Sequence, residues 1–228
     1  MRTKNTLLAL LIVCAACSKS SVGPTPQSIC YFYGDSITVG FAASSQGKRW
    51  TSVLSFLKGW SESNLGVDGE TLEAIPGQPS GNDFFDQYKT IIPTKPTNGK
   101  YIFISFGAND CGINDAAYTP ASFSTQLQTI ITYANSIGWA NKNIVVVCGY
   151  FLTPASFSFW NTNGNAAATM TRYNSFILAA QTVSQNNPGV YFVNPFNSYG
   201  ASGLSADMVH PNDAGYAAIA GYVASLVP

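Results

Sequence analysis

Short apolar runs alternate with helical patterns along most of the chain, and this alternation constrains the fold more than any other feature. Residues 30–34, 101–107 and 143–151 form apolar runs rich in aromatic or β-branched side chains. Continuous runs of this kind are typical of strands buried on both faces of a parallel sheet. A fifth strand is predicted at "VYFVNP" (190–195), and "WSESNLG" is a more polar candidate for the second strand.

Apolar residues recur at helical spacing in the segments between these runs. The predicted helices are "RWTSVLSFLKG", ended by Gly59; "DFFDQYKTII", stopped by Pro93; and stripes over 123–134, 170–183 and 216–223. Strands that alternate with helices predict a three-layer α/β sandwich around a parallel sheet of about five strands. Residues 29–228 contain no internal repeat or linker, so we predict one domain there.

The predicted architecture indicates where a functional site should lie. In open α/β sheets, ligands bind beyond the carboxyl ends of the strands. Polar or glycine-containing peptides stand at 34–36, 64–71, 107–110 and 207–210, and three of them directly follow predicted strands. We therefore expect these peptides to converge at one edge of the sheet.

The chain has a single histidine, His210, within "ADMVHPNDAGY". Asp207, three residues upstream on a tight loop, can reach the imidazole Nδ1–H and fix the tautomer, which leaves Nε2 to take a proton from a serine. Histidine is suited to this because it titrates near neutral pH. The alternative is that Asp207 is a turn or helix-capping residue. Ser36, in "YFYGDSITVG", is either the matching nucleophile or an ordinary turn residue.

Two further peptides offer donors for a developing oxyanion. Asn109 ends a predicted strand in "SFGANDCG", where its amide can donate a hydrogen bond. The segment "NLGVDGET" carries two glycines, and each lets the backbone approach a ligand closely. Taken singly, either peptide could be an ordinary turn.

These peptides resemble the blocks of the SGNH or GDSL hydrolases, a family named for a Ser, a Gly, an Asn and a His in separate blocks. "GDSIT" matches the first block with Ser36, although Ile37 stands where the family name has leucine. "NLGVDGET" is similar to the second block. The family's glycine precedes an acidic residue and a threonine, which corresponds to Gly69 and not to Gly66.

The third and last blocks are "GAND", with Asn109, and "DMVHP", with Asp207 and His210. The order and spacing of the four blocks agree from residue 31 to 216. No Gly-x-Ser-x-Gly elbow surrounds the serine, which disfavours the ordinary α/β-hydrolase.

The resemblance implies a flavodoxin-like α/β/α fold and a catalytic serine. Ser36 would be the nucleophile, His210 the base and Asp207 the residue that orients the base. The oxyanion hole would be formed by the backbone N–H groups of Ser36 and Gly69 and the side chain of Asn109. We expect no cofactor, because the sequence has no metal-ligand cluster and no phosphate-binding loop.

The first residues have the pattern of an export signal. Arg2 and Lys4 precede an apolar run that is too short to span a bilayer. Residues 1–16 are predicted as a signal peptide, with a buried N-terminal helix as the alternative. "CAACSKSS" resembles a bacterial lipoprotein signal in which Cys17 becomes lipidated, although Cys14 stands where leucine is usual. Ordinary signal cleavage nearby is the alternative to lipidation.

Residues 17–28 are polar with two prolines and are predicted as a flexible tether. The protein would then be a lipoprotein of the bacterial cell envelope, facing the periplasm or the surface, and otherwise a secreted protein. Its contact with the membrane would run only through the lipid at Cys17.

The charge balance excludes one class of partner, and the cysteine content limits the possible disulfides. Eleven basic and eleven acidic side chains balance, which excludes the basic footprint of a nucleic-acid binder. Removal of residues 1–16 leaves nine basic side chains against eleven acidic, a formal charge of −2. Cys30, Cys111 and Cys148 allow one disulfide in an exported protein, but the sequence does not select the pair.

The sequence therefore predicts an exported serine esterase that acts on a small-molecule or glycan ester. The aromatic segment "GYFLTPASFSFWNTNGNAAA" favours short acyl groups on carbohydrates, with Tyr150, Phe159 and Trp160 as candidate sugar-contacting residues. These aromatics could equally pack onto the fold. Lipase, thioesterase and acyltransferase activity are alternatives for the same fold, as is an inactive surface binding module.

Overall fold

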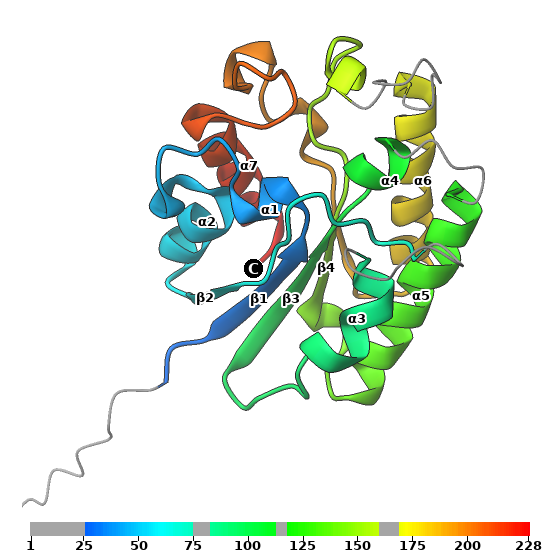
Figure 1. Ribbon diagram of the computed structural model, residues 1–228. Helices are drawn as coiled ribbons and strands as arrows, with labels where there is room; N and C mark the ends of the chain where they lie inside the picture. Colours follow the sequence, from blue (N-terminus) through cyan, green and yellow to red (C-terminus); the bar gives the residue numbers. More distant parts are fainter. Residues whose placement is uncertain (1–25, 75–82, 113–117, 160–168) are drawn as a thin grey trace, which may run out of the picture.

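A computed structural model describes residues 26–74, 83–112, 118–159 and 169–228. Five parallel strands form one sheet in the order β2-β1-β3-β4-β5, which is the flavodoxin-like order. The strands are β1 (Ile29–Gly34), β2 (Ser61–Asn64), β3 (Gly99–Ser105), β4 (Ile144–Val147) and β5 (Tyr191–Val193). They run upward in Figure 1, so their carboxyl ends lie at the top.

Helices cover both faces of the sheet, with α2 and α7 on one side and α3, α5 and α6 on the other (Figure 1). The helices are α1 (Ser36–Val39), α2 (Trp50–Lys58), α3 (Phe84–Ile91), α4 (Ala108–Gly112), α5 (Pro120–Ser136), α6 (Met170–Gln185) and α7 (Asp213–Leu226). Short 3₁₀ turns lie at Gln46–Lys48, Asn141–Asn143, Ser156–Phe159, Pro195–Asn197 and Ala201–Gly203. The three-layer α/β/α sandwich expected from the sequence is confirmed.

Local signals in the sequence set the ends of the helices. Thr119 and Ser122 form a reciprocal capping box at the start of α5, with Pro120 in the first turn. Asn212 caps α7 by accepting hydrogen bonds from two backbone N–H groups. Helix α2 ends at Gly59, which adopts the left-handed conformation that glycine allows, as the sequence predicted.

The core consists of two clusters of buried side chains, one on each face of the sheet. In the cluster under α2 and α7, Phe32 of β1 stacks on its register partner Phe103 of β3, with ring centroids 4.5 Å apart. Trp50 of α2 contacts Phe32 edge-on at 5.5 Å. Such aromatic pairs contribute about 0.5–1.5 kcal/mol beyond the area they bury.

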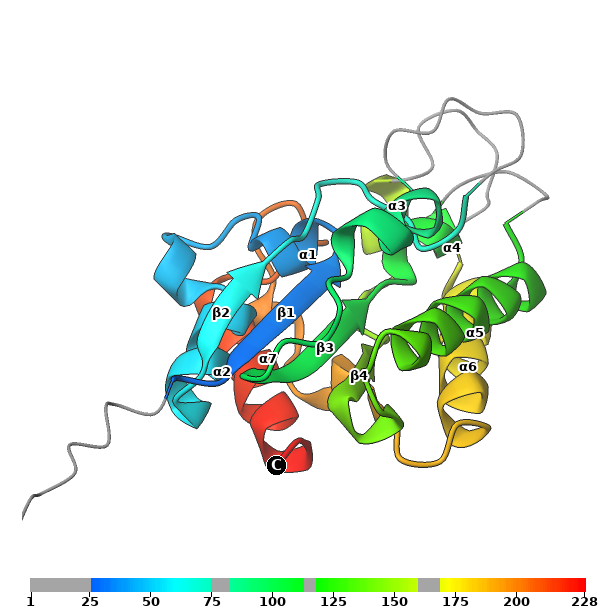
Figure 2. The ribbon, with the colours of Figure 1, turned by 90° about the horizontal axis from the view of Figure 1, so that it is seen from below.

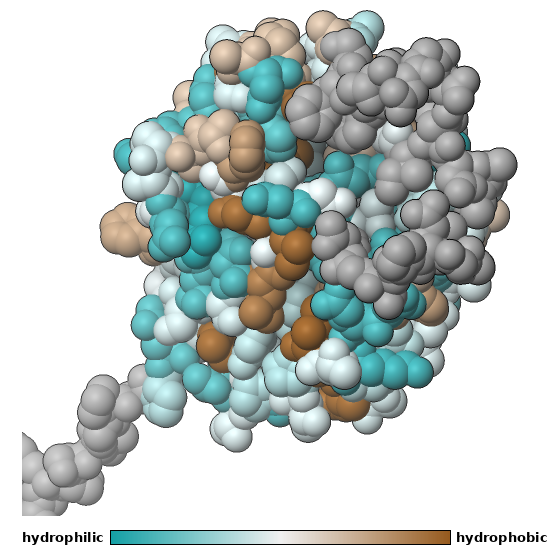
Figure 3. Space-filling view, viewed as in Figure 1, coloured by the Kyte–Doolittle hydropathy of each residue, from teal (hydrophilic) through white to brown (hydrophobic). Residues whose placement is uncertain are grey.

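The surface seen from the β2 edge of the sheet is mostly hydrophilic or neutral, with hydrophobic groups near its middle (Figure 3). Leu65 and Val67, which follow β2, are partly exposed on the molecule. Among the described residues, no helix is long and apolar enough to cross a bilayer.

The predicted signal peptide, and Cys17 with it, lie outside the described residues. The disulfide that the cysteine count allowed does not form, because Cys30, Cys111 and Cys148 are all free and buried. Each packs in the core as a small apolar side chain.

Candidate active site

Ser36 stands at the abrupt turn from β1 into α1, at the carboxyl edge of the sheet. Asp35 caps α1 by accepting a hydrogen bond from the Ile37 backbone N–H at 2.9 Å. Gly34 is required before it, because a Cβ there would lie 2.3 Å from Thr38 Oγ1 and 2.5 Å from the Ser105 carbonyl oxygen. The Gly-Asp-Ser sequence therefore holds the serine hydroxyl in a tight turn at the end of a central strand.

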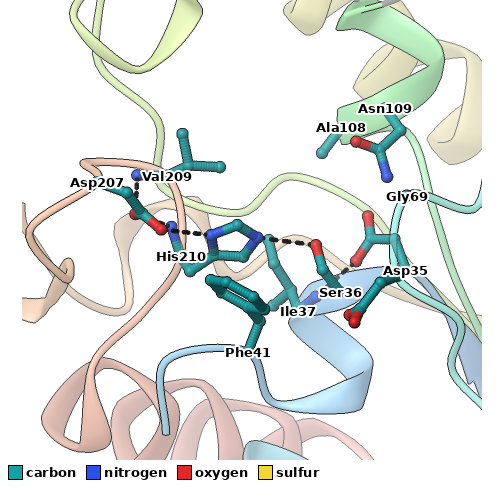
Figure 4. A pocket seen from close by; sticks show the side chains of 11 residues that line it. Asp35, Ser36, Ile37, Phe41, Gly69, Ala108, Asn109, Asp207, Val209 and His210 are labelled. Carbon is teal, nitrogen blue, oxygen red and sulfur yellow. Dashed lines mark hydrogen bonds and ion pairs between the residues drawn. The ribbon is translucent and has the colours of Figure 1, made fainter. Parts of the chain in front are cut away.

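The side chains of Ser36, His210 and Asp207 form a continuous hydrogen-bonded series (Figure 4). His210 Nε2 lies 2.8 Å from Ser36 Oγ. His210 Nδ1 lies 2.7 Å from Asp207 Oδ2. The structure thus brings together three side chains from opposite ends of the chain with the geometry that base-assisted attack by a serine requires.

The Asp207 carboxylate is held by its own loop. Its Oδ1 accepts hydrogen bonds from the Val209 N–H, the His210 N–H and the Ser205 hydroxyl at 2.7–2.9 Å, which leaves Oδ2 for the imidazole. Partial burial alone would raise the pKa of Asp207, but these hydrogen bonds outweigh it and hold the pKa well below its usual range. Asp207 is thus an ionised acceptor for His210 across the neutral pH range.

Donors for an oxyanion lie on the other side of Ser36. Gly69 has a φ of +76°, which favours glycine, and no atom lies within 4 Å of where its Cβ would be. Within the described part of the chain, the backbone N–H groups of Ser36 and Gly69 donate to no other protein group. Asn109 Nδ2 donates to the Glu70 carbonyl oxygen at 3.0 Å, which holds the amide with its nitrogen toward Gly69 and Ser36 (Figure 4).

Asp110 fixes this half of the site from behind. Its Oδ1 accepts hydrogen bonds from the backbone N–H groups of Leu72 and Glu73, at 2.9 and 3.0 Å. Its Oδ2 accepts from the Gly107 N–H at 3.1 Å. One buried carboxylate therefore ties the segment that carries Gly69 to the turn that carries Asn109.

Four carboxyl groups are buried in or behind the wall of the pocket, and burial is the main cause of their raised pKa values. The pKa of Asp35 is raised to about 7 and that of Asp110 to about 6, where hydrogen bonds from backbone N–H groups oppose the effect of burial. The pKa values of Glu70 and Glu73 are each raised to about 8. Repulsion from neighbouring carboxyl groups adds to the raised pKa values of Asp35, Glu70 and Glu73.

A pocket of about 440 Å³ opens over the serine hydroxyl (Figure 4). Its lining residues are Asp35, Ser36, Ile37, Phe41, Asp68, Gly69, Ala108, Asn109, Asp207, Val209 and His210. Phe41 is half-exposed at this pocket, with its ring centroid 4.4 Å from that of His210. The volume lies in the lower part of the range for small-molecule sites.

Every residue predicted for the triad and the oxyanion hole lines this one pocket. The expectation that Tyr150 contacts a sugar is wrong. Its side chain is 1% exposed, and its hydroxyl is hydrogen-bonded to Ser105 under the sheet edge. The side chain of Phe159 and the whole of Trp160 lie outside the described residues.

The sequence reasoning missed Phe41 and the anchoring role of Asp110. The sequence does not indicate a role for Phe41, because its contact with the His210 ring joins segments that are far apart in the chain. Asp110 stands inside the quoted block "GAND", but its partners are backbone groups from a distant segment.

The fold and the pocket together define a class, the hydrolases that place a serine and a histidine at the carboxyl edge of a flavodoxin-like sheet to cleave esters. Within that class the chain belongs to the GDSL-like lipase/acylhydrolase family, whose model matches residues 32–218. It is therefore a carboxylic ester hydrolase. No curated protein matches the chain.

Solved structures of esterases share the fold. A carbohydrate acetylesterase family member from Sinorhizobium meliloti aligns with a TM-score of 0.68 at 15% identity, over 88% of this chain and 97% of its own. A lipase/acylhydrolase from Enterococcus faecalis has a TM-score of 0.65 at 18% identity, covering 87% and 94%. An acetyl xylan esterase from Geobacillus stearothermophilus has a TM-score of 0.62 at 16% identity, covering 88% and 94%. At these identities the likeness shows the fold.

The described residues contain no group of three or more His, Cys, Asp or Glu side chains able to hold a metal ion.

Proposed function

We propose that the protein hydrolyses short-chain acyl esters, above all acetyl esters of carbohydrates, through an acyl-enzyme on Ser36. The observation that carries this proposal is the 2.8 Å contact between Ser36 Oγ and His210 Nε2 inside the 440 Å³ pocket. The hydroxyl, its base and the oxyanion donors all face the same space.

In the first half of the reaction, Ser36 Oγ attacks the ester carbonyl carbon while His210 Nε2 takes the hydroxyl proton. The carbonyl oxygen becomes an oxyanion and accepts hydrogen bonds from the Ser36 and Gly69 N–H groups and the Asn109 amide. The ionised Asp207 stabilises the imidazolium. Collapse of the intermediate breaks the bond to the alcohol, which leaves with the proton from His210.

In the second half, water replaces the alcohol. His210 Nε2 takes a proton from the water as its oxygen attacks the acyl carbon, and the oxyanion forms again at the same donors. Collapse breaks the bond to Ser36 Oγ, which recovers its proton from the imidazolium. The products are the carboxylic acid and the free enzyme.

The charges around the pocket favour an uncharged substrate. The described residues that line it include the carboxyl groups of Asp68 and Asp207 but no lysine or arginine. A phosphorylated thioester or an anionic lipid headgroup would meet negative charge here without a compensating cation. An acyl group on a neutral sugar hydroxyl meets no such repulsion.

The size of the pocket and the nature of the relatives support a short acyl group. A volume of about 440 Å³ must hold the acyl group together with part of the alcohol. Two of the structural relatives are described as a carbohydrate acetylesterase family member and an acetyl xylan esterase. One observation favours a second candidate, a long-chain acylhydrolase, because the half-exposed ring of Phe41 could guide an acyl chain out of the pocket.

A series of p-nitrophenyl esters from acetyl to palmitoyl, together with acetylated xylan, tests the proposed substrate class. We expect kcat/KM to fall steadily beyond butyryl and acetate to be released from the polymer. Phe41→Ala enlarges the mouth of the pocket and should raise the relative rate on longer chains. Faster cleavage of palmitoyl than acetyl esters by the unchanged protein would instead support the long-chain acylhydrolase.

We also propose that the protein is exported and anchored through a lipid on Cys17. The proposal rests on the charged and apolar start of the chain and on "CAAC" before a polar segment. Cys17→Ser should abolish palmitate labelling in a bacterial host and make the protein's membrane association releasable by high salt. Cys14→Ser is the matched control and should leave labelling intact, whereas labelling that survives Cys17→Ser contradicts lipidation there.

A further inference from the structure

Most described acidic residues lie at one edge of the sheet and most described lysines at the other, whereas Lys48, Arg49 and Arg172 stand at or just before helix starts on the pocket side. Except for Glu62, every described acidic residue follows the carboxyl end of a strand or stands at the start of a helix, on the side of the pocket. Five lysines lie at the opposite edge, where helices end and strands begin, and we call them the lysine edge: Lys58, Lys89, Lys95, Lys100 and Lys142. The segments 59–60, 92–98, 137–143 and 186–190 at that edge contain no aspartate or glutamate.

Contacts between neighbouring segments join the segments that carry Lys58, Lys100, Lys142 and Lys95 into a row, while Lys89 stands in the last turn of α3. Lys58 and Lys100 both lie over the ring of Trp60, at 5.9 and 4.8 Å from its centroid. The Lys100 carbonyl oxygen accepts a hydrogen bond at 2.8 Å from Asn143, the residue next to Lys142. The Lys95 N–H donates to the Ile137 carbonyl oxygen at 3.0 Å, at the start of the segment that leads to Lys142.

Apolar side chains stand beside this row. Phe56 is 85% exposed and Leu57 is 55% exposed, both in the last turn of α2. Leu226, the last residue of the adjacent α7, is also exposed. These side chains stand at the carboxyl ends of two helices that pack against each other on one face of the sheet.

The N-terminal part of the chain leaves the fold at the same edge. Gln27 Nε2 donates to the Gly59 carbonyl oxygen at 2.9 Å, so the chain enters β1 beside the end of α2. Figure 2 views the molecule from this end and shows the start of β1 next to β2 and α2. A lipid attached at Cys17 would be twelve residues before Ile29, within roughly 40 Å of this edge.

We propose that the lysine edge docks on an anionic bilayer surface, with Phe56 and Leu57 entering the interface. Basic side chains near an anionic surface and apolar side chains at the headgroup boundary contribute jointly to such binding. In this orientation the acidic edge and the pocket over Ser36 face away from the membrane, toward soluble or polymeric esters. The surface acts without the lipid on Cys17 and is separate from the ester chemistry.

Co-sedimentation with vesicles of phosphatidylcholine, with or without phosphatidylglycerol, tests the proposal. The protein used is a chain that starts at Ser18, which retains all strands and helices that the structure describes and both core clusters. We expect binding only when phosphatidylglycerol is present and weaker binding as salt rises. Replacement of Lys58, Lys100 and Lys142 by glutamine should weaken partitioning about 100-fold, at about fivefold per lysine. Phe56→Ser should weaken it about tenfold.

Lys48→Gln is the matched control, because Lys48 is exposed on the pocket side of the fold and its loss changes the net charge without touching the lysine edge. It should bind vesicles like the unchanged protein. Hydrolysis of soluble p-nitrophenyl acetate should be the same in all these variants, which shows that they fold. Absence of binding to phosphatidylglycerol vesicles, equal binding by the triple variant, or an equal loss in Lys48→Gln would overturn the proposal.

Discussion

Ser36→Ala will lower kcat/KM for p-nitrophenyl acetate by about 10⁴-fold or more, an increase in the activation free energy of about 5 kcal/mol or more. Without the hydroxyl there is no group at 2.8 Å from His210 Nε2 to form the acyl-enzyme. The residual rate would come from the oxyanion donors and from binding alone. Steady-state kinetics on purified protein measures the loss.

A fluorophosphonate probe gives an independent readout of the same serine. The unchanged protein should gain one probe adduct, located at Ser36 by peptide mass spectrometry, and Ser36→Ala should gain none. Ser136→Ala is a suitable control, because its hydroxyl donates to a carbonyl oxygen at the exposed end of α5, far from the pocket. Near-normal activity of Ser36→Ala, or an adduct on another residue, would exclude Ser36 as the nucleophile.

Asn109→Ala will lower kcat by about 10²–10³-fold with little change in KM. The Asn109 amide is held toward Gly69 and Ser36 by its hydrogen bond to the Glu70 carbonyl oxygen at 3.0 Å. Its interaction with the substrate strengthens as the carbonyl oxygen gains charge, so its loss raises the barrier more than it weakens ground-state binding.

Asn143→Ala supplies a matched comparison for Asn109→Ala. The Asn143 amide also donates to a carbonyl oxygen, that of Lys100 at 2.8 Å, but at the edge of the sheet opposite the pocket. The two variants lose a similar amide–carbonyl hydrogen bond, so a similar fall in stability combined with a loss of kcat only in Asn109→Ala identifies an oxyanion donor. An increase in KM alone would assign Asn109 to ground-state substrate binding.

The strands and helices were predictable because their hydrophobic patterns reflect burial directly. The runs that became β1, β3 and β4 are apolar because both faces of those strands lie under helices. The hydrogen-bonded series of Ser36, His210 and Asp207 was predictable because these residues stand in short local blocks and His210 is the single histidine of the sequence.

The direction of an individual side chain was not predictable from local sequence. Tyr150 and Phe41 both stand near polar residues just beyond a strand or a short helix, yet one is buried and the other lies over His210. The lysine edge was also not predictable from the sequence. Its five lysines are spread from Lys58 to Lys142, and only the fold brings them to one side.

The anchoring of the oxyanion donors by Asp110 bears on how such an enzyme can acquire new substrates. The Asp110 carboxylate accepts hydrogen bonds from backbone N–H groups. The position of the segment around Gly69 therefore does not depend on which side chains that segment carries. Phe41 and Val209, which line the pocket, come from other segments. We therefore expect mutations at Phe41 to change substrate selectivity while the proposed oxyanion donors keep their positions.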